Sequence, residues 1–187
     1  MELDIFRILD SGKVRRWHTN PQLSTTLQSD ADHTWGVIAI AEYLCKDLVD
    51  LNFMRFALYH DCGEIAIGDI SSVVKMRRTD LSILIKECEN KEIKRMGIEM
   101  PKITPEQKRL MKLSDILEAS YHILKYAPCP NEVEGLEASL SMISSLIFDF
   151  GPKADDIYQK IDFKFNALIA QRGLRNKFDE IISITPF

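Results

Sequence analysis

Residues 60–75 read HDCGEIAIGDISSVVK and follow an apolar segment with the spacing of a helix. We predict this helix over about 52–62, with Gly63 as its stop signal. His60 and Asp61 then stand at its end. Neighbours on a regular helix project about 100° apart, so both reach one ion only where a helix ends or is distorted. The stretch is therefore compatible with a metal-binding pair at a helix terminus.

Apolar residues recur at helical spacing along the rest of the chain, and no segment shows the alternation typical of a strand. We expect an all-α fold, a compact bundle of six or seven helices. The predicted helices are a short one at 3–9, one that begins near Asp30 or Asp32, and others at 52–62, 79–96, 105–126, 131–149 and 154–172, with a helix or docked tail at 178–184.

The composition is that of an ordinary globular protein. With 187 residues and 45% hydrophobic side chains, the chain can bury a core, and we expect a single domain over 1–187. The net charge of −4 argues against stable binding to nucleic acid or an anionic membrane surface. No apolar run approaches the roughly 20 residues that span a bilayer, and the first residues lack the apolar core of a signal peptide. We therefore expect a cytoplasmic protein.

The cysteines contain no CxxC pair, which argues against a thiolate zinc site and a disulfide framework. We expect them to be buried and reduced. They are Cys45, Cys62, Cys88 and Cys129.

Two further residues are candidates to complete a metal site with His60 and Asp61. His33 lies on the second predicted helix and Asp115 within LMKLSDILEASY (residues 110–121), each on an otherwise apolar face. A carboxylate on such a face is costly to bury unless it is paired or bound to metal. Imidazole nitrogen and carboxylate oxygen together suit Mn, Fe, Co or Zn.

Each candidate also has an ordinary interpretation. The His60-Asp61 pair could be two polar surface residues, and Asp115 could cap a helix that begins at Ile116. His33 could follow a helix cap and be half-exposed. Composition and periodicity alone therefore permit a metal site without establishing one.

The order of these residues is more specific than any of them alone. A His, then His-Asp, then Asp, each on a separate predicted helix, resembles the H…HD…D signature of the HD-domain superfamily. The stretch at 60–75 is similar to the segment of bacterial HD-domain 5′-deoxynucleotidases and their small phage relatives that reads HD, two small residues, E, then GD and a Lys. VRRWHTNP (14–21) and ADHTWGV (31–37) resemble the same subfamily, although Asp32 stands where that subfamily has Glu.

Lys112 matches a Lys that the subfamily places three residues before its last Asp. The resemblance covers about residues 10–125. It implies a metal-site core at about 14–125, with additional C-terminal helices at 130–187 that match only in being helical.

The resemblance implies a phosphohydrolase that holds one divalent ion, Mn, Co, Fe or Zn, with additional Mg when the substrate is a triphosphate. Such an ion polarises the phosphorus centre and lowers the pKa of its bound water. The implied metal ligands are His33, His60, Asp61 and Asp115.

The resemblance also assigns roles around the metal. Glu64 is implied as the acid/base group and Asp69 as a second carboxylate, both of which could instead be surface acids near turns. The cations that would stabilise developing charge, Arg16, Lys75 and Lys112, could instead belong to a solvated basic face.

Trp17 is implied to pack where a ribose 2′-hydroxyl would sit, favouring deoxyribose, and could instead be a core or interface aromatic. His18 could contact substrate or be a spectator. His122 matches no implied ligand, and we expect a core histidine or one that supports a ligand.

Three functions follow, of which the first is a 2′-deoxynucleotide phosphohydrolase. The short chain and the RRWHT word favour a phage-type triphosphohydrolase of dNTPs (dATP), with a 5′-deoxynucleotidase acting on dNMPs as the alternative. The second is another superfamily hydrolase that acts on signalling or cyclic nucleotides. The third is a non-catalytic helical metal-binding regulatory module, against which the intact Glu64, Asp69, Lys75 and Lys112 argue.

The expected partner is a small deoxynucleotide, with no nucleic acid and no membrane. A phage-encoded enzyme would work in the host cytoplasm. The resemblance also favours a homo-oligomer, with an interface that could use Leu146, Ile147, Phe148 and Phe150.

Overall fold

The computed structural model describes residues 2–173, which form eight α-helices and no β-strand, confirming the all-α class. Short 3₁₀ turns join several of the helices. The predicted segment at 178–184 lies outside the described residues. The helices are α1 (Ile5–Ser11), α2 (Asp30–Cys45), α3 (Leu51–Tyr59), α4 (Ser72–Arg77), α5 (Thr79–Arg95), α6 (Pro105–Tyr126), α7 (Leu136–Phe148) and α8 (Ala154–Gln171).

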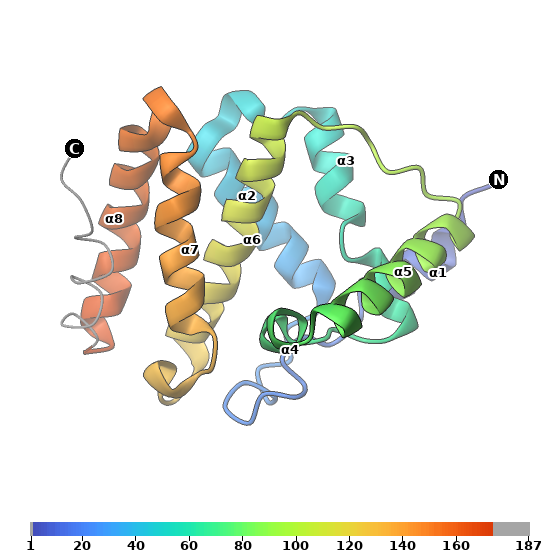
Figure 1. Ribbon diagram of the computed structural model, residues 1–187, viewed down its shortest axis with the longest axis horizontal. Helices are drawn as coiled ribbons and strands as arrows, with labels where there is room; N and C mark the ends of the chain where they lie inside the picture. Colours follow the sequence, from blue (N-terminus) through green and yellow to red (C-terminus); the bar gives the residue numbers. More distant parts are fainter. Residues whose placement is uncertain (1, 174–187) are drawn as a thin grey trace.

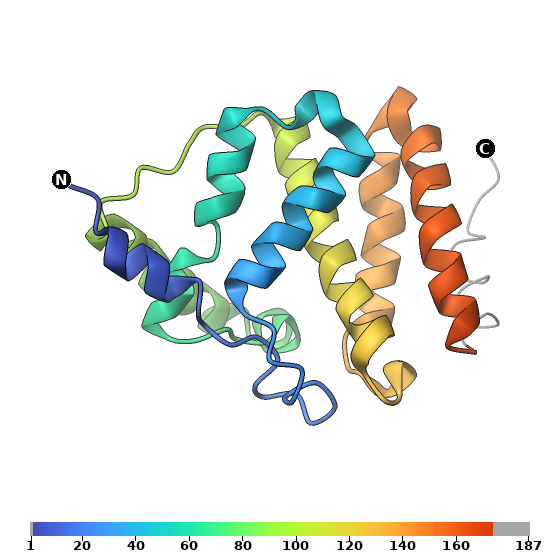
Figure 2. The same ribbon diagram turned by 180° about the vertical axis from the view of Figure 1, so that it is seen from behind.

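The helices form two groups. In Figures 1 and 2, α2, α6, α7 and α8 lie side by side, while α1 and α5 lie at the other end of the molecule. The 3₁₀ turn at Cys62–Ala66 packs on both α1 and α5. The first turn of α2 and the end of α3 therefore meet at the junction between the groups.

Helix α6 is central to the larger group. It begins at a capping box, in which Thr104 and Gln107 satisfy each other's backbone N–H groups and Pro105 takes the first helical position. Leu110, Leu113 and Leu117 on this helix are completely buried. Burying each such side chain contributes about 1.5–3 kcal/mol, so α6 anchors the core against which α2 packs.

The start of α2 differs from the prediction. Its N-cap is Ser29, not Asp30 or Asp32, and Ser29 and Asp32 form a capping box. The Ser29 hydroxyl accepts from the Asp32 backbone N–H at 3.2 Å, and the Asp32 carboxylate accepts from the Ser29 backbone N–H at 3.0 Å. Because Ser29 caps the helix, the Asp30 side chain is not needed for capping and is buried at 4% exposure.

The end of α3 also differs. The helix stops at Tyr59, so the predicted stop at Gly63 is wrong. Gly63 lies within the 3₁₀ turn, where a Cβ atom would stand 2.6 Å from the backbone oxygen of Glu89 on α5. Glycine is therefore needed here for the close approach of α5 rather than to end a helix.

Two further elements depart from the predicted boundaries. The short helix α4 falls at Ser72–Arg77, where no helix was predicted. Helix α7 begins at Leu136 rather than 131, because Gly135 before it adopts a left-handed conformation with φ of 92°. Both differences arise in short segments, where periodicity is a weak signal.

The four cysteines can be compared with the expectation that they are buried and reduced. Cys62 is buried and Cys45 half-buried, but Cys88 and Cys129 are exposed, so the expectation of burial is wrong for these two. All four are free thiols.

No described helix has the length and apolarity needed to cross a bilayer.

Of the four residues suggested for an oligomer interface, only Phe148 is well exposed, at 65%. Ile147 and Phe150 are buried in the core and Leu146 is half-buried. These residues therefore serve mainly to pack α7 within the chain, because the apolar stripe of α7 faces inward.

Candidate metal centre and active site

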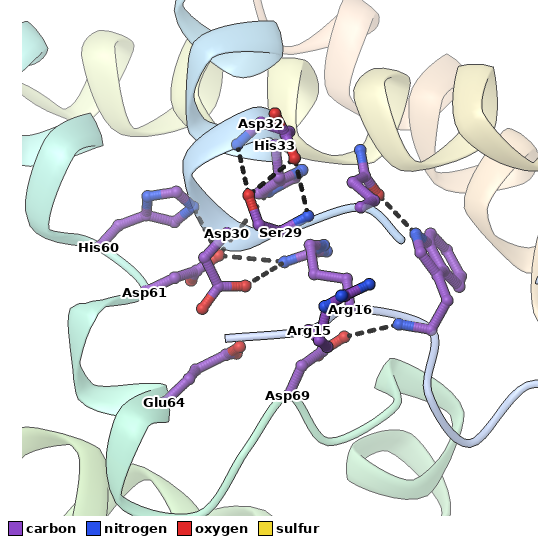
Figure 3. Close-up of polar contacts among 12 residues, drawn as sticks. Arg15, Arg16, Ser29, Asp30, Asp32, His33, His60, Asp61, Glu64 and Asp69 are labelled. Carbon is purple, nitrogen blue, oxygen red and sulfur yellow. Dashed lines mark hydrogen bonds and ion pairs between the residues drawn. The ribbon is translucent and has the colours of Figure 1, made fainter. Parts of the chain in front are cut away.

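Nitrogen and oxygen donors from three helical segments converge at the junction of the two groups. One ligand atom each from His33, His60 and Asp115 lies within 4.8 Å of the others. His33 comes from the second turn of α2, His60 follows the last residue of α3, and Asp115 lies in the middle of α6. Figure 3 shows His33, His60 and Asp61 turned toward one another.

Both histidines have one ring nitrogen engaged and the other turned into the site. His60 Nδ1 lies 2.6 Å from the backbone oxygen of Ala57, which can only accept, so Nδ1 carries the proton. His33 Nδ1 is bonded to the carboxylate of Glu118. Both Nε2 atoms are buried without a well-aligned hydrogen bond, and each faces a carboxylate oxygen, His33 that of Asp115 at 3.2 Å and His60 that of Asp61 at 3.0 Å. Two buried Nε2 atoms that face carboxylates suit a divalent metal.

Asp61 extends this donor set. Its Oδ2 lies 3.0 Å from His60 Nε2 and 3.7 Å from His33 Nε2. The structure thus brings together the four residues that the sequence singled out as ligands. His33 is completely buried, so the half-exposed interpretation is wrong. Asp115 lies inside an uninterrupted helix, so the helix-cap interpretation is wrong as well.

Arg16 is a largely buried cation beside this group. Its Nη1 lies 3.2 Å from Asp61 Oδ2 and 3.8 Å from Asp30 Oδ1. Burial by itself would lower the pKa of the Arg16 guanidinium, but the carboxylates of Asp61, Asp69 and Asp115 outweigh burial and raise it. Arg16 therefore stays charged and is held against the donor set.

A second acidic group adjoins the first. Oxygen atoms of Asp30, Asp61 and Glu64 lie within 4.8 Å of one another, and Asp30 and Glu64 are both buried. Both carboxylate oxygens of Asp30 and one of Glu64 have no hydrogen-bond partner. Burial and the charge of Asp61 raise the pKa of Asp30 to about 7. This group contains only oxygen donors, which suits a hard cation such as Mg²⁺.

Glu64 is buried rather than on the surface, so that alternative is wrong. Lys75 Nζ lies 3.5 Å from Glu64 Oε1 and 3.4 Å from Glu89 Oε1. Burial and the charges of Asp61 and Asp69 raise the pKa of Glu64 to about 9, against the opposing effect of Lys75. In the absence of a bound cation, the Glu64 carboxyl group therefore holds a proton at neutral pH.

Trp17 stands beside this acidic group in an unusual backbone conformation, with φ of 61°. Its backbone N–H donates to Asp69 Oδ2 at 3.4 Å and its indole Nε1 donates to Gln28 Oε1 at 2.5 Å. The indole stacks on the His122 ring, with centroids 5.6 Å apart and planes at 3°. A left-handed tryptophan is sterically costly, so these contacts hold it in place.

A cavity of about 840 Å³ opens at these residues. Its lining includes the predicted cations Arg16, Lys75 and Lys112, of which Lys112 Nζ lies 2.9 Å from Asp115 Oδ2. The lining also has an apolar wall, which comes from α6, α7 and the segment between them. Its residues include Ile116, Ala119, Ile123, Val133, Ala138 and Met142.

Sequence reasoning missed three buried polar residues at this site, Asp30, Gln28 and Glu118. Asp30 was taken only as a possible cap. Glu118 follows Asp115 by three residues on α6, a spacing that places both on one helix face and could have identified it. No local pattern distinguishes Gln28.

His18, which the sequence left as a substrate contact or a spectator, is exposed, and its Nδ1 lies 3.0 Å from the Arg15 backbone oxygen.

Comparison with known proteins agrees with this geometry. The family model described as 5′-deoxynucleotidase YfbR-like matches residues 7–135, a range that includes the four proposed metal ligands and the cations of the cavity. Searches of the curated proteins and of the solved structures each found no match. The chain therefore belongs to the YfbR-like 5′-deoxynucleotidase family of the HD-domain superfamily, whose members are metal-dependent phosphohydrolases.

Proposed function

We propose that the chain is a 2′-deoxynucleotide phosphohydrolase whose divalent transition metal is held by His33, His60, Asp61 and Asp115. One observation carries the proposal, namely that converging donor atoms within 4.8 Å stand at the edge of a cavity with cationic side chains. A divalent metal bound there supplies Lewis-acid polarisation of a phosphate oxygen and an acidified water. The donors are mixed nitrogen and oxygen, which favours Mn, Fe, Co or Zn.

The cations of the cavity would bind the phosphate end of the substrate. Arg16 is largely buried and permanently charged, which suits a bidentate contact to two non-bridging phosphate oxygens. Lys75 and Lys112 reach the cavity from α4 and α6. Fixed positive charges in a partly buried site stabilise the charge that develops on phosphate oxygens and leaving group.

Glu64 would move the proton. It is buried beside Asp61 and pairs with Lys75, and a cation bound nearby would lower its pKa. In that state it would accept a proton from an attacking water and return one to the leaving oxygen. Asp69, whose Oδ2 already accepts from the Trp17 backbone, would orient the substrate beside that residue.

The sugar and base would occupy the part of the cavity between Trp17 and the apolar wall of α6 and α7. Trp17 is held from three directions by Asp69, Gln28 and His122. A rigid indole cannot move aside for a 2′-hydroxyl or offer it a hydrogen bond, because its one donor is already used. This supports a preference for deoxyribose.

Two phosphate-chain lengths are candidates. The family description favours a 5′-deoxynucleotidase acting on dNMPs. The size of the cavity and its cations favour a triphosphohydrolase of dNTPs such as dATP. For the longer substrate, the oxygen-only group of Asp30, Asp61 and Glu64 supports additional Mg²⁺.

The test is a panel of ribo- and deoxynucleoside mono-, di- and triphosphates, each assayed with Mn²⁺, Co²⁺ or Mg²⁺ and with the inorganic product identified. Phosphate from dNMPs indicates the nucleotidase, and triphosphate from dNTPs indicates the triphosphohydrolase. Turnover that survives Asp61→Ala would overturn the metal-based proposal. Failure to hydrolyse any nucleotide would favour the regulatory module.

We further propose a single domain and a homo-oligomeric cytoplasmic protein that does not bind nucleic acid stably. Size-exclusion chromatography with light scattering tests the oligomer.

A further inference from the structure

Two buried side chains connect the proposed metal ligand His33 to the proposed sugar-recognition residue Trp17. The Trp17 indole N–H donates to Gln28 Oε1 at 2.5 Å, and Gln28 Nε2 donates to Glu118 Oε1 at 2.7 Å. The second oxygen of Glu118 accepts from His33 Nδ1. A continuous hydrogen-bonded chain of four side chains therefore runs from the cavity wall to the metal centre.

The two end groups of this series of hydrogen bonds fix which atom donates and which accepts at each step. An indole N–H can only donate and an ionised carboxylate can only accept, so the Gln28 amide satisfies both neighbours in one orientation only. A flipped amide would oppose donor to donor on one side and acceptor to acceptor on the other. The position of the Trp17 indole therefore influences the orientation of Gln28, and through it the Glu118 carboxylate.

Gln28 and Glu118 are placed to support other residues rather than to touch substrate. Gln28 is 7% exposed and Glu118 is 5% exposed, and neither lines the cavity. In the backbone, the Gln28 oxygen accepts from the Arg16 N–H at 2.9 Å, so the same residue also anchors the strand-like segment that carries Arg16 and Trp17.

We propose that Gln28 and Glu118 are positioning residues that couple metal affinity at His33 to the sugar preference of Trp17. Glu118 holds the His33 ring with Nε2 facing the metal and increases its basicity. Gln28 transmits the position of the indole to Glu118. The sugar half of this inference rests on the proposed function of Trp17, whereas the metal half requires only the ligand set.

Three variants test this series of hydrogen bonds without removing a proposed metal ligand. Glu118→Gln keeps the shape and removes the charge, Gln28→Met removes both hydrogen bonds at similar volume, and Trp17→Phe keeps an aromatic ring without the N–H donor. Matched controls are Glu92→Gln, a buried carboxylate on α5 that pairs with Arg7, and Trp35→Phe, an exposed indole on α2. Circular dichroism verifies that every variant is folded.

The first readout is the dissociation constant of Co²⁺ alone, measured by calorimetric titration of the metal-stripped protein. We expect the constant to rise about 10- to 100-fold for Glu118→Gln and roughly tenfold for Gln28→Met, as is typical of lost partners of metal ligands. Both controls should stay within about twofold of the wild type. Trp17→Phe should weaken binding in the wild-type background and have no further effect when combined with Gln28→Met, because it acts through that residue.

The second readout is the ratio of kcat/KM for deoxyadenosine and adenosine nucleotides, which should fall several-fold in Gln28→Met. Co²⁺ affinity or a selectivity ratio that stays at the wild-type value in folded Gln28→Met would overturn the coupling. Because the Co²⁺ titration uses no nucleotide, a wild-type protein without turnover would defeat the proposed function while the titration still decides the metal half.

Discussion

Gly36 on α2 leaves the space that the Glu118 side chain from α6 occupies. A Cβ atom at Gly36 would lie 2.6 Å from Cγ and 3.3 Å from Cδ of Glu118. Gly36 follows His33 by about one helical turn, so the missing side chain lets Glu118 pass over α2 and reach the His33 ring. A glycine inside a helix is otherwise unfavourable by about 1 kcal/mol relative to alanine, which makes this steric need its physical explanation.

Gly36→Ala is therefore expected to destabilise the protein although alanine is the better helix former. The added methyl group displaces a buried carboxylate, and overpacking of this kind costs about 1–3 kcal/mol. Urea unfolding measures the change in free energy, and Ala39→Gly at an exposed position of α2 calibrates helix propensity alone. A variant as stable as the wild type would show that the Glu118 side chain is not held in this position.

Metal should stabilise the folded protein through the predicted ligands. At a free Mn²⁺ concentration about 100 times its dissociation constant, the folded state gains about 2.7 kcal/mol, and a chelator removes this gain. Asp61→Asn should lose both the gain and the hydrolytic activity. Thermal unfolding with and without Mn²⁺ measures the first effect, with the exposed Asp155→Asn as the control. Equal stabilisation of Asp61→Asn and wild type would contradict the ligand assignment.

Lys112 offers a test of the phosphate-chain length. It lines the cavity, its side chain is 54% exposed, and its Nζ reaches Asp115 Oδ2. Lys112→Gln should reduce kcat/KM roughly tenfold for the substrate whose phosphates it contacts, the range expected for losing one hydrogen bond to a charged group. Steady-state kinetics on dAMP and dATP would show which substrate loses more. Lys108→Gln, one turn earlier on α6 and exposed, is the control and should change neither.

His122, which is not among the proposed metal ligands, predicts a pH dependence of stability. The ring is buried, stacks on Trp17 and bonds Thr26 through Nε2 at 2.9 Å. Burial lowers the pKa of His122, and the Glu118 carboxylate offsets only part of this effect. Below about pH 6.5, the ordinary pKa of histidine, the unfolded state binds more protons than the folded state, so stability falls with pH.

The measurement compares unfolding free energies of wild type and His122→Asn between pH 8 and pH 5. Other titrating groups act on both proteins, so the difference isolates His122. We expect the wild-type advantage to shrink as the pH falls below about 6.5 toward the folded-state pKa, and to level off below that pKa. An advantage that grows toward low pH would mean that the charged ring is stabilised instead.

Local sequence patterns anticipated much of the site. Periodicity predicted the helices that carry His33 and Asp115, and the pair His60-Asp61 was expected at a helix end, as the stop at Tyr59 confirms. Such features depend on neighbours within a few residues along the chain, and the residue types record them. Among these local features, the details of capping, such as Ser29 in place of Asp30, required the structure.

Packing between distant segments decided the rest. The close approach of Glu89 to Gly63, and the chain that joins Trp17 to His33 through Gln28 and Glu118, link residues far apart in sequence. No local propensity distinguishes a glutamine that will be buried from one that will face water. The HD pair and its order along the chain could thus be recognised in the sequence. The hydrogen-bond partners that orient each ligand depend instead on how α2 and α6 pack, because burial creates the need for those hydrogen bonds.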